Sequence, residues 1–251
     1  MSALLEVSGI SKHFGGLHAL RDVSFSVAPA EIVGILGPNG AGKTTLYNLL
    51  TGFIPPDSGS IVFDGRDLRG LAPYRIAGLG VSRTFQLCRP FVGMTVFENV
   101  IVGGLGARGR RDADLEAHGR ALLDQVGLAG KERLQVEALS YGDQRRLEIA
   151  RALAAKPALL LLDEPFAGLG SGEIADLSAL IRSVHAEQGL TVMLIEHKLR
   201  EFMRLVGRVI ALDFGEVIAE GSPEDIVRHP AVIEAYIGRG DEQASEQDYA
   251  A

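Results

Sequence analysis

The segment GPNGAGKTT, residues 37–45, constrains the fold of this chain more than any other. It follows EIVGIL, an apolar run that favours a strand, and it precedes a segment up to Gly52 that favours a helix. Gly37 and Gly42 place no Cβ between the backbone N–H groups and a bound anion. We therefore predict a strand, a phosphate-binding loop and a helix in succession, with the helix N-terminus facing the phosphates.

The spacing in this loop fits G-x-x-x-x-G-K-[ST], with Gly37, Gly42, Lys43 and Thr44 at the fixed positions. The Lys43 ammonium can reach the β and γ phosphates of a nucleotide, and the Thr44 hydroxyl can ligate Mg²⁺. Thr45 can support the loop. The alternative is a glycine-rich turn with a chance lysine, which the flanking strand and helix patterns disfavour.

Short apolar runs alternate with helical patterns along much of the chain. ALLLLDEP and TVMLIEH are continuous apolar runs, and strands of this kind separated by helices favour a parallel sheet covered on both faces. The alternating stretch 4–27 instead favours antiparallel strands, and residues 72–138 are rich in helical pattern. We therefore predict an α/β fold, with a parallel sheet core, an antiparallel β subdomain and a helical subdomain.

Length and composition indicate how the chain is divided. We expect one nucleotide-binding domain over residues 1–238, with the helical subdomain inserted at about 88–157. Within it, GGLGARGRRD at 103–112 is typical of a solvated loop. The polar tail 239–251 is predicted to be disordered.

Charge and cysteine content exclude several classes of protein. A net charge of −7 disfavours a protein built to bind nucleic acid. The single cysteine, Cys88, excludes an internal disulfide and suits a reducing compartment. We expect no secretory signal, and no apolar run is long enough to span a bilayer. The prediction is a cytosolic protein that would reach a membrane only through another subunit.

Two acids follow the apolar run ALLLLDEP, at Asp163 and Glu164. In a parallel sheet they would emerge at the edge where the phosphate-binding loop also leaves its strand. Asp163 can hold Mg²⁺, often through water, and Glu164 can act as general base toward the attacking water. A solvated strand end is the alternative interpretation, and it leaves the pair of acids unexplained.

Three further residues are candidates on weaker grounds. His197 closes TVMLIEH and could hydrogen-bond the γ phosphate, although a lone histidine at a strand end is more often a surface residue. Gln86, in SRTFQ, could contact Mg²⁺ or the water, although a loop glutamine usually has no such role. Phe14, in KHFGG, could stack on adenine, and core packing is an equal alternative.

The segment LSYGDQRRLEIARAL, residues 139–153, resembles the LSGGQ signature of ATP-binding cassette (ABC) ATPases, and kinases and GTPases have no reason to carry it. The resemblance runs from Phe14 to about Gly238. It implies ATP and Mg²⁺ as ligands, with Lys43, Glu164 and His197 catalytic and Thr44, Gln86 and Asp163 near the metal. The nucleotide-binding positions it implies are Phe14, Gly37, Pro38, Asn39, Gly40, Ala41, Gly42, Lys43, Thr44, Thr45, Gln86, Ser140, Gly142 and Asp163.

In this family the signature faces the nucleotide of the opposite subunit. Ser140 and the N–H of Gly142 lie at a predicted helix N-terminus, which suits an anion. The resemblance thus implies two ATP molecules between two chains. Hydrolysis removes the γ phosphate that bridges them, and the pair opens.

The chain departs from the family pattern at several positions. Tyr141 and Asp143 replace the Gly and Gln of the usual signature, and Lys198 follows the switch histidine where an acid is frequent. AGLG, ending at Gly170, replaces the usual SALD-type D-loop, so a side chain that commonly crosses the interface is missing. Cys88 could line a groove for a membrane helix, or could be a small packed residue.

Within the family, the stretches FGGLHAL, MTVFENV, DEPFAGL and GSPEDIVRHPAVIEAYIG resemble the ATP-binding subunit of branched-chain amino acid importers. That resemblance implies membrane permeases, a second ATPase subunit that is identical or dissimilar, an extracytoplasmic substrate-binding protein, and a peripheral place on the cytoplasmic face of the inner membrane. Urea, aromatic acid or lipopolysaccharide transport, and a soluble non-transport ABC ATPase, stay as alternatives.

Overall fold

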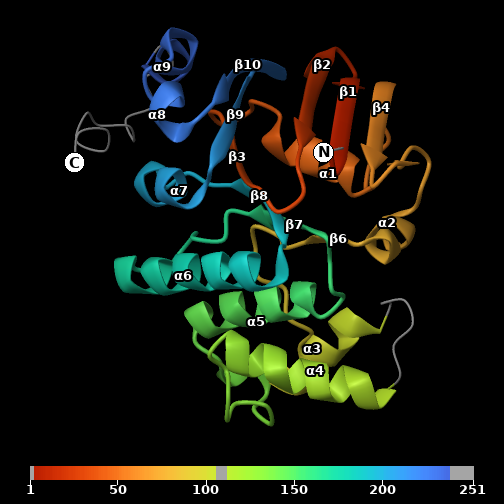
Figure 1. Ribbon diagram of the computed structural model, residues 1–251, viewed down its shortest axis with the longest axis vertical. Coiled ribbons are helices and arrows are strands. Elements are labelled where there is room, and N and C mark those ends of the chain that lie inside the picture. Colours follow the sequence, from red (N-terminus) through yellow and green to blue (C-terminus); the bar gives the residue numbers. More distant parts are fainter. Residues whose placement is uncertain (1–2, 106–111, 238–251) are drawn as a thin grey trace. The chain divides into compact units, whose positions relative to one another are not determined.

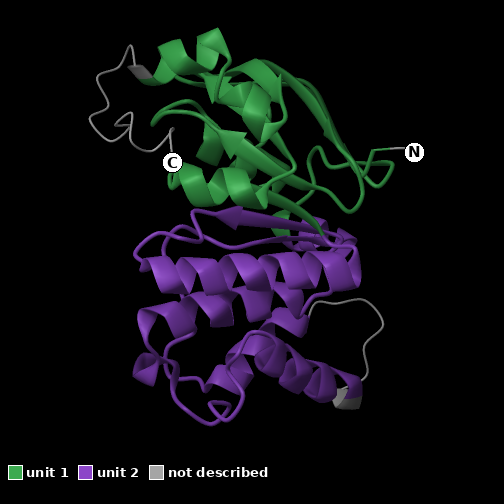
Figure 2. Cartoon of the chain, turned by 60° about the vertical axis from the view of Figure 1, so that its left-hand side comes forward, with its two compact units in different colours: residues 1–73, 191–251 green, residues 74–190 purple. Residues whose placement is uncertain are grey.

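The computed structural model describes residues 3–105 and 112–237. The chain forms two compact units, residues 1–73 with 191–251, called unit 1, and residues 74–190, called unit 2 (Figure 2). The predicted tail 239–251 lies outside the described residues, as do residues 106–111 of the predicted loop.

Unit 1 contains an antiparallel sheet of four strands in the order β2-β1-β4-β5. Its strands are β1 (Leu5–Phe14), β2 (Leu17–Val27), β4 (Ser58–Phe63) and β5 (Arg66–Asp67). Leu5 and Val7 are buried while Glu6 between them is exposed, as expected where one face covers a core. The antiparallel N-terminal region predicted from this alternation is confirmed.

The second sheet of unit 1 has parallel pairs at its centre (Figure 1). The strands that unit 1 contributes to this sheet are β10 (Glu216–Gly221), β9 (Arg208–Asp213), β3 (Ile32–Leu36) and β8 (Thr191–Ile195). β3 pairs in parallel with both β8 and β9, and every residue of β3 and β8 is buried. Those two strands are the continuous apolar runs of the sequence, as strands covered on both faces require.

The described part of unit 1 also contains four helices, namely α1 (Lys43–Leu50), α7 (Leu199–Leu205), α8 (Pro223–Ile226) and α9 (Pro230–Ile237). α7 packs closely on β3 at Gly34, where a Cβ would collide with the ring of Phe202. Glycine at this strand position therefore serves close packing of a helix on the sheet.

Unit 2 joins a parallel pair of strands to a stack of helices. Its elements are α2 (Pro73–Leu79), β6 (Val81–Arg83), α3 (Val96–Gly104), α4 (Asp112–Gln125), the 3₁₀ turn η1 (Val136–Ala138), α5 (Tyr141–Leu153), β7 (Leu159–Asp163) and α6 (Ser171–Gln188). α3 lies against α4 and α5 (Figure 1). Of the loop predicted at 103–112, Gly103 and Gly104 instead belong to α3 and Asp112 begins α4.

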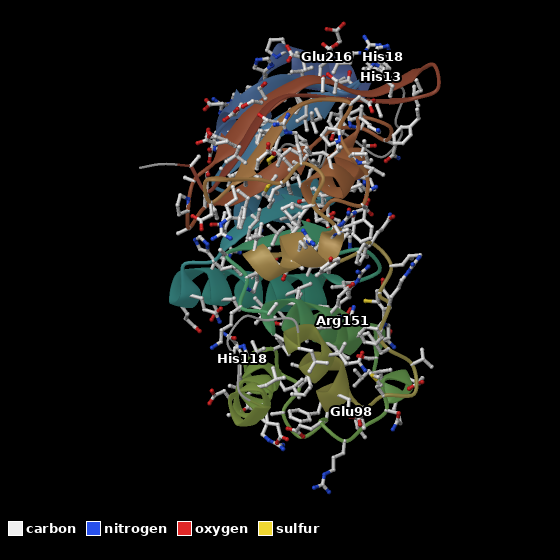
Figure 3. All side chains as sticks on the ribbon, turned by 90° about the vertical axis from the view of Figure 1, so that its right-hand side faces the viewer. His13, His18, Glu98, His118, Arg151 and Glu216 are labelled. Carbon is white, nitrogen blue, oxygen red and sulfur yellow. The ribbon has the colours of Figure 1, made fainter. Side chains whose placement is uncertain are left out.

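Close contact between α3 and α5 depends on a small residue. A Cβ at Gly103 would collide with the backbone carbonyl of Arg151 on α5. At its start, α3 is fixed by a capping box, in which Thr95 and Glu98 each accept the other's backbone N–H (Figure 3 labels Glu98). Across the described ranges, none of the helices combines the length and apolar character needed to cross a bilayer.

Candidate functional site

The phosphate-binding loop of unit 1 connects β3 to α1 as the sequence predicted. Gly37 and Gly42 both have positive φ, at 157° and 104°, and a Cβ at either would collide with a backbone carbonyl, of Leu212 and Ala19 respectively. Gly42 occupies the N-cap position of α1 and has no side chain to satisfy the first N–H groups of the helix. Those N–H groups suit an anion.

Lys43 lies within the curve of this loop and is buried. Its Nζ donates to the carbonyl oxygens of Gly37 at 2.5 Å and Pro38 at 3.1 Å. A buried ammonium needs such acceptors, and an incoming phosphate would offer a stronger, charged one. Thr44, in contrast, is exposed at the start of α1, where its hydroxyl can reach a ligand.

A second support of this loop comes from the far end of the chain. The hydroxyl oxygen of Tyr236, on α9, accepts the N–H of Gly37 at 3.1 Å. The role of Tyr236 could not be predicted from the sequence, because nothing in the pattern of α9 indicates which distant backbone group a tyrosine hydroxyl will contact.

Phe14 ends β1 at a hairpin, and 49% of its surface is exposed. That exposure excludes the core-packing alternative. The Lys12 ammonium lies 5.7 Å from the ring centroid of Phe14 and donates to Asp57 at 2.7 Å. His13 and His18 face each other across the same hairpin (Figure 3), with ring centroids 4.1 Å apart.

Titratable groups around this hairpin are shifted by their neighbours. The hydrogen bond from Lys12 lowers the pKa of Asp57, and the bonds from His13 lower it further. Desolvation, followed by the nearby His13, lowers the pKa of His18. The Asp57 carboxylate therefore stays ionised, and it fixes the backbone next to the exposed ring of Phe14 through the His13 N–H at 2.7 Å.

His197 lies in the turn that follows β8, and it is exposed. The turn is held by the buried Glu196, whose carboxylate accepts the N–H of His197 at 2.8 Å and of Lys198 at 3.1 Å. A buried acid thus presents the histidine at the surface. Glu196 is a second supporting residue that the sequence analysis missed.

In unit 2, the structure brings two of the predicted residues together. Gln86 Nε2 donates to the Glu164 carboxylate at 2.8 Å. Glu164 has φ of +49°, in the left-handed region that non-glycine residues rarely occupy. Strained backbone of this kind clusters at functional sites, where surrounding structure maintains it.

Asp163 is buried at the end of β7 and forms an ion pair that the sequence analysis did not anticipate. Arg83 Nη2 donates to its carboxylate at 2.7 Å, and both side chains are 5% exposed. Its backbone N–H also reaches the hydroxyl of Thr84 at 3.4 Å. The arginine on β6 therefore neutralises the acid and fixes its orientation.

The signature segment begins α5, with Ser140 as N-cap. The Ser140 hydroxyl accepts the N–H of Asp143 at 3.2 Å, and its own O–H remains able to donate to an anion. An added Cβ at Gly142 would lie 2.4 Å from a carboxylate oxygen of Glu173, so a larger residue there would displace the end of that side chain. Asp143, one of the departures from the family signature, pairs with Lys131 at 2.5 Å.

The residues of unit 1 fit a nucleotide phosphate chain, since they offer a glycine-lined loop, uncapped helix N–H groups and a buried lysine. In the described parts of the chain, no three His, Cys, Asp or Glu side chains gather as a metal cluster. A metal here would accordingly be held between phosphate oxygens and one or two protein oxygens, which is the usual mode for Mg²⁺. Fold and loop together define a nucleotide-binding protein of the P-loop class.

Comparison with known proteins specifies the family. The family model of the ABC transporter matches residues 20–167, and that of the branched-chain amino acid ATP-binding cassette transporter matches residues 216–242. The chain belongs to the ABC transporter family, as its signature segment predicted. It is an ATP-binding, ATP-hydrolysing subunit of a transporter.

Relatives match almost over their full length. The high-affinity branched-chain amino acid transport ATP-binding protein LivG of Escherichia coli (strain K12) is 43% identical, covering 94% of this chain and 98% of the relative. BraF of Pseudomonas aeruginosa, also a high-affinity branched-chain amino acid transport ATP-binding protein, is 41% identical, covering 94% of this chain and 98% of the relative.

Solved structures agree with this fold. The ADP conformation of MJ1267, an ATP-binding cassette of an ABC transporter, matches with a TM-score of 0.87 and 31% identity over 95% of this chain and all of that one. The dimeric post-hydrolysis state of the cassette MJ0796 bound to ADP and Pi matches with a TM-score of 0.78 and 26% identity, over 87% and 98% of the two chains. The predicted α/β fold of the ABC ATPase type is confirmed.

Proposed function

We propose that this chain is the motor subunit of an importer for branched-chain or related amino acids. The observation that carries the proposal is the match to LivG and BraF, which covers 94% of the chain. The match of residues 216–242 to the branched-chain transporter model adds support from a separate segment. Its partners are membrane permeases and a second ATPase subunit, with a substrate-binding protein outside the cell, and its place is the cytoplasmic face of the membrane.

The roles of the site residues follow from their surroundings. Residues 37–45 receive the phosphates of ATP, Lys43 exchanges its loop carbonyls for the β and γ phosphates, and Phe14 stacks on adenine. Thr44, Gln86 and Asp163 are the residues that would hold Mg²⁺, which supplies charge neutralisation on the phosphates when bound.

Glu164 is the general base. Gln86 donates to its carboxylate at 2.8 Å and so orients it, and Glu164 then takes the proton from the attacking water. His197, presented by Glu196, donates to the γ phosphate. Ser140 and the N–H of Gly142 bind the γ phosphate of the ATP molecule that is held by a second ATPase subunit. Two chains thereby close over two ATP molecules.

The transport role is tested by uptake in the source organism. Deleting the gene should abolish uptake of labelled leucine, the intact gene should restore it, and Lys43→Ala should not. Unchanged leucine uptake, with loss of urea, aromatic acid or other amino acid uptake, would assign a different substrate to the same motor. Normal uptake of all of these would contradict an importer.

Assembly is tested by light scattering on Glu164→Gln with and without Mg-ATP. A doubling of mass with Mg-ATP would indicate that Ser140 and Gly142 complete a site across two identical chains. A protein that binds ATP and stays monomeric would place the other half of the site on a dissimilar ATPase.

A further inference from the structure

The segment from Phe85 to Phe91, here called loop 85–91, is held along one side of α5 by three charged side chains. Arg145 Nη1 donates to the carbonyl of Phe85 at 3.0 Å, and its Nη2 donates to the carbonyl of Gln86. Glu148 accepts the N–H of Phe85 at 3.2 Å and the thiol of Cys88 at 3.5 Å. The loop is thus attached through its backbone as well as its side chains.

Arg151 extends this attachment by another turn of the helix (Figure 3). Its Nη1 donates to the carbonyl of Arg89 at 2.8 Å, and its guanidinium lies 5.1 Å from the ring centroid of Phe91. Arg145, Glu148 and Arg151 are spaced three residues apart, which puts them on one face of α5. That face carries the whole loop.

Tyr141, which replaces a glycine of the usual signature, belongs to the same arrangement. Its hydroxyl accepts from Arg145 Nη2 at 2.8 Å, and the guanidinium lies 5.3 Å from its ring centroid. The ring also borders Gly168, where an added Cβ would come within 2.8 Å of it. The tyrosine therefore touches both the arginine that holds loop 85–91 and the segment that follows Glu164.

Burial makes the position of Arg145 depend on these acceptors. Its side chain is 2% exposed and that of Glu148 is 5% exposed. A buried guanidinium needs acceptors for its donors, and here the two Nη groups donate to Tyr141, two loop carbonyls and Glu148, while Nε has no hydrogen-bond partner among the described residues. Because the planar guanidinium binds several acceptors at fixed angles, its orientation sets the position of the loop backbone.

We propose that Tyr141 and Arg145 are positioning residues, which fix loop 85–91 to the first turn of the signature helix. A movement of Ser140 and Gly142 at the start of α5 is then passed to loop 85–91, and it changes the contact between Gln86 and Glu164. A nucleotide bound at the signature is in this way sensed by the general base of the same chain. The functional consequence rests on the proposed function, whereas the structural connection does not.

Cys88 allows a direct test, because it is the single cysteine of the chain and sits in the loop. Its thiol is partly buried and donates to Glu148 at 3.5 Å, so contact with α5 shields it from iodoacetamide. Alkylation at pH 8 therefore reports how tightly the loop lies on α5.

The variant is Tyr141→Phe, which keeps the ring and removes the acceptor of Arg145. Its matched control is Tyr74→Phe, since the Tyr74 hydroxyl also accepts from an arginine, Arg75 Nε at 3.3 Å, but is exposed and outside the loop. We expect Tyr141→Phe to speed alkylation about fivefold and to speed amide exchange at residues 86–89, with the control unchanged. Equal rates in both variants would overturn the connection.

Kinetics separates positioning from simple packing. Tyr141→Phe should lower kcat about fivefold with the Kd for ATP unchanged, because only the orientation of Gln86 and Glu164 is disturbed. A faster alkylation with unaltered kcat would overturn the role in catalysis. Arg145→Lys keeps the charge but not the planar group, and it should show the same changes. If Arg145→Lys does not fold, the result for Tyr141→Phe is sufficient to test the proposal.

Failure of this inference is distinguishable from failure of the proposed function. Alkylation and amide exchange are measured without nucleotide, so they test the connection between loop and helix whatever the chain transports. Unchanged hydrolysis in Lys43→Ala would overturn the assigned site and leave the connection standing.

Discussion

The phosphate-binding loop of unit 1 and loop 85–91 of unit 2 are held in place by different means. Residues 37–43 are supported mainly from within, since two glycines adopt conformations that side chains resist and Lys43 binds the loop's own carbonyls, with one distant contact from Tyr236. Loop 85–91 depends on buried charges from a helix some sixty residues later, and Arg145 is the chief example. The conformation of a loop that is supported mainly by its own residues can be predicted from the local sequence. The conformation of a loop that distant residues hold in place cannot.

The difference has an energetic consequence. Glycine conformations and backbone contacts cost little to maintain and are lost only when those few residues change. Buried charged pairs, in contrast, leave an uncompensated charge when one partner is removed, which costs about 3–5 kcal/mol. We therefore expect substitutions of supporting residues to destabilise unit 2 more than unit 1, while unit 1 is most sensitive in the loop itself.

The largest expected effect is on nucleotide binding by the phosphate-binding loop. Lys43→Ala should lower ATP hydrolysis about 10²–10³-fold with weakened ATP binding, because the buried ammonium is the loop's charged donor. The control is Lys156→Ala, a lysine on the turn after α5. Hydrolysis is measured by phosphate release, and equal rates in both variants would contradict the assigned site.

The corresponding change in unit 2 should separate binding from chemistry. Glu164→Gln should retain ATP binding and lower turnover about 10²-fold or more, since the amide cannot accept the proton. Glu116→Gln, an exposed acid on α4, serves as the control. Fluorescent nucleotide titration and phosphate release together check the result, and near-normal turnover would place the base elsewhere.

Stability should distinguish buried from exposed ion pairs. Arg83→Met removes the partner of the buried Asp163 and should lower the free energy of unfolding by about 3–5 kcal/mol. Arg69→Met breaks an exposed pair with Asp67 in unit 1 and should cost about 0–1 kcal/mol. Urea denaturation measures the free energy of unfolding of both variants. Similar decreases in the two would mean that the buried ion pair contributes no more to stability than the exposed one.

The smallest effect concerns the contact between α9 and the phosphate-binding loop. Tyr236→Phe removes the acceptor of the Gly37 N–H and should weaken ATP binding by about 1 kcal/mol, a few-fold rise in Kd. Tyr74→Phe is again the matched control. An unchanged Kd would mean that the loop holds its shape without α9, which would sharpen the contrast with loop 85–91.

Local patterns identified the strands and helices well, with errors at their ends. The helix predicted to reach Gly52 ends earlier, at Leu50. Helix ends are set by caps and by the last hydrogen bonds, which side-chain periodicity does not record. Core packing of Phe14 was excluded by its exposure, a property of the surrounding fold.

The sequence by itself determined the phosphate-binding loop, the signature helix and the alternation of strands and helices, because each depends on neighbours within a few residues. Only the tertiary structure decided that Arg83 pairs with Asp163, that Tyr236 reaches Gly37, and that Arg145 holds the carbonyl of Gln86. These contacts join residues 59 to 199 positions apart. Which distant groups meet is fixed when helices and strands pack, and buried charges and hydroxyls then need the partners that packing supplies.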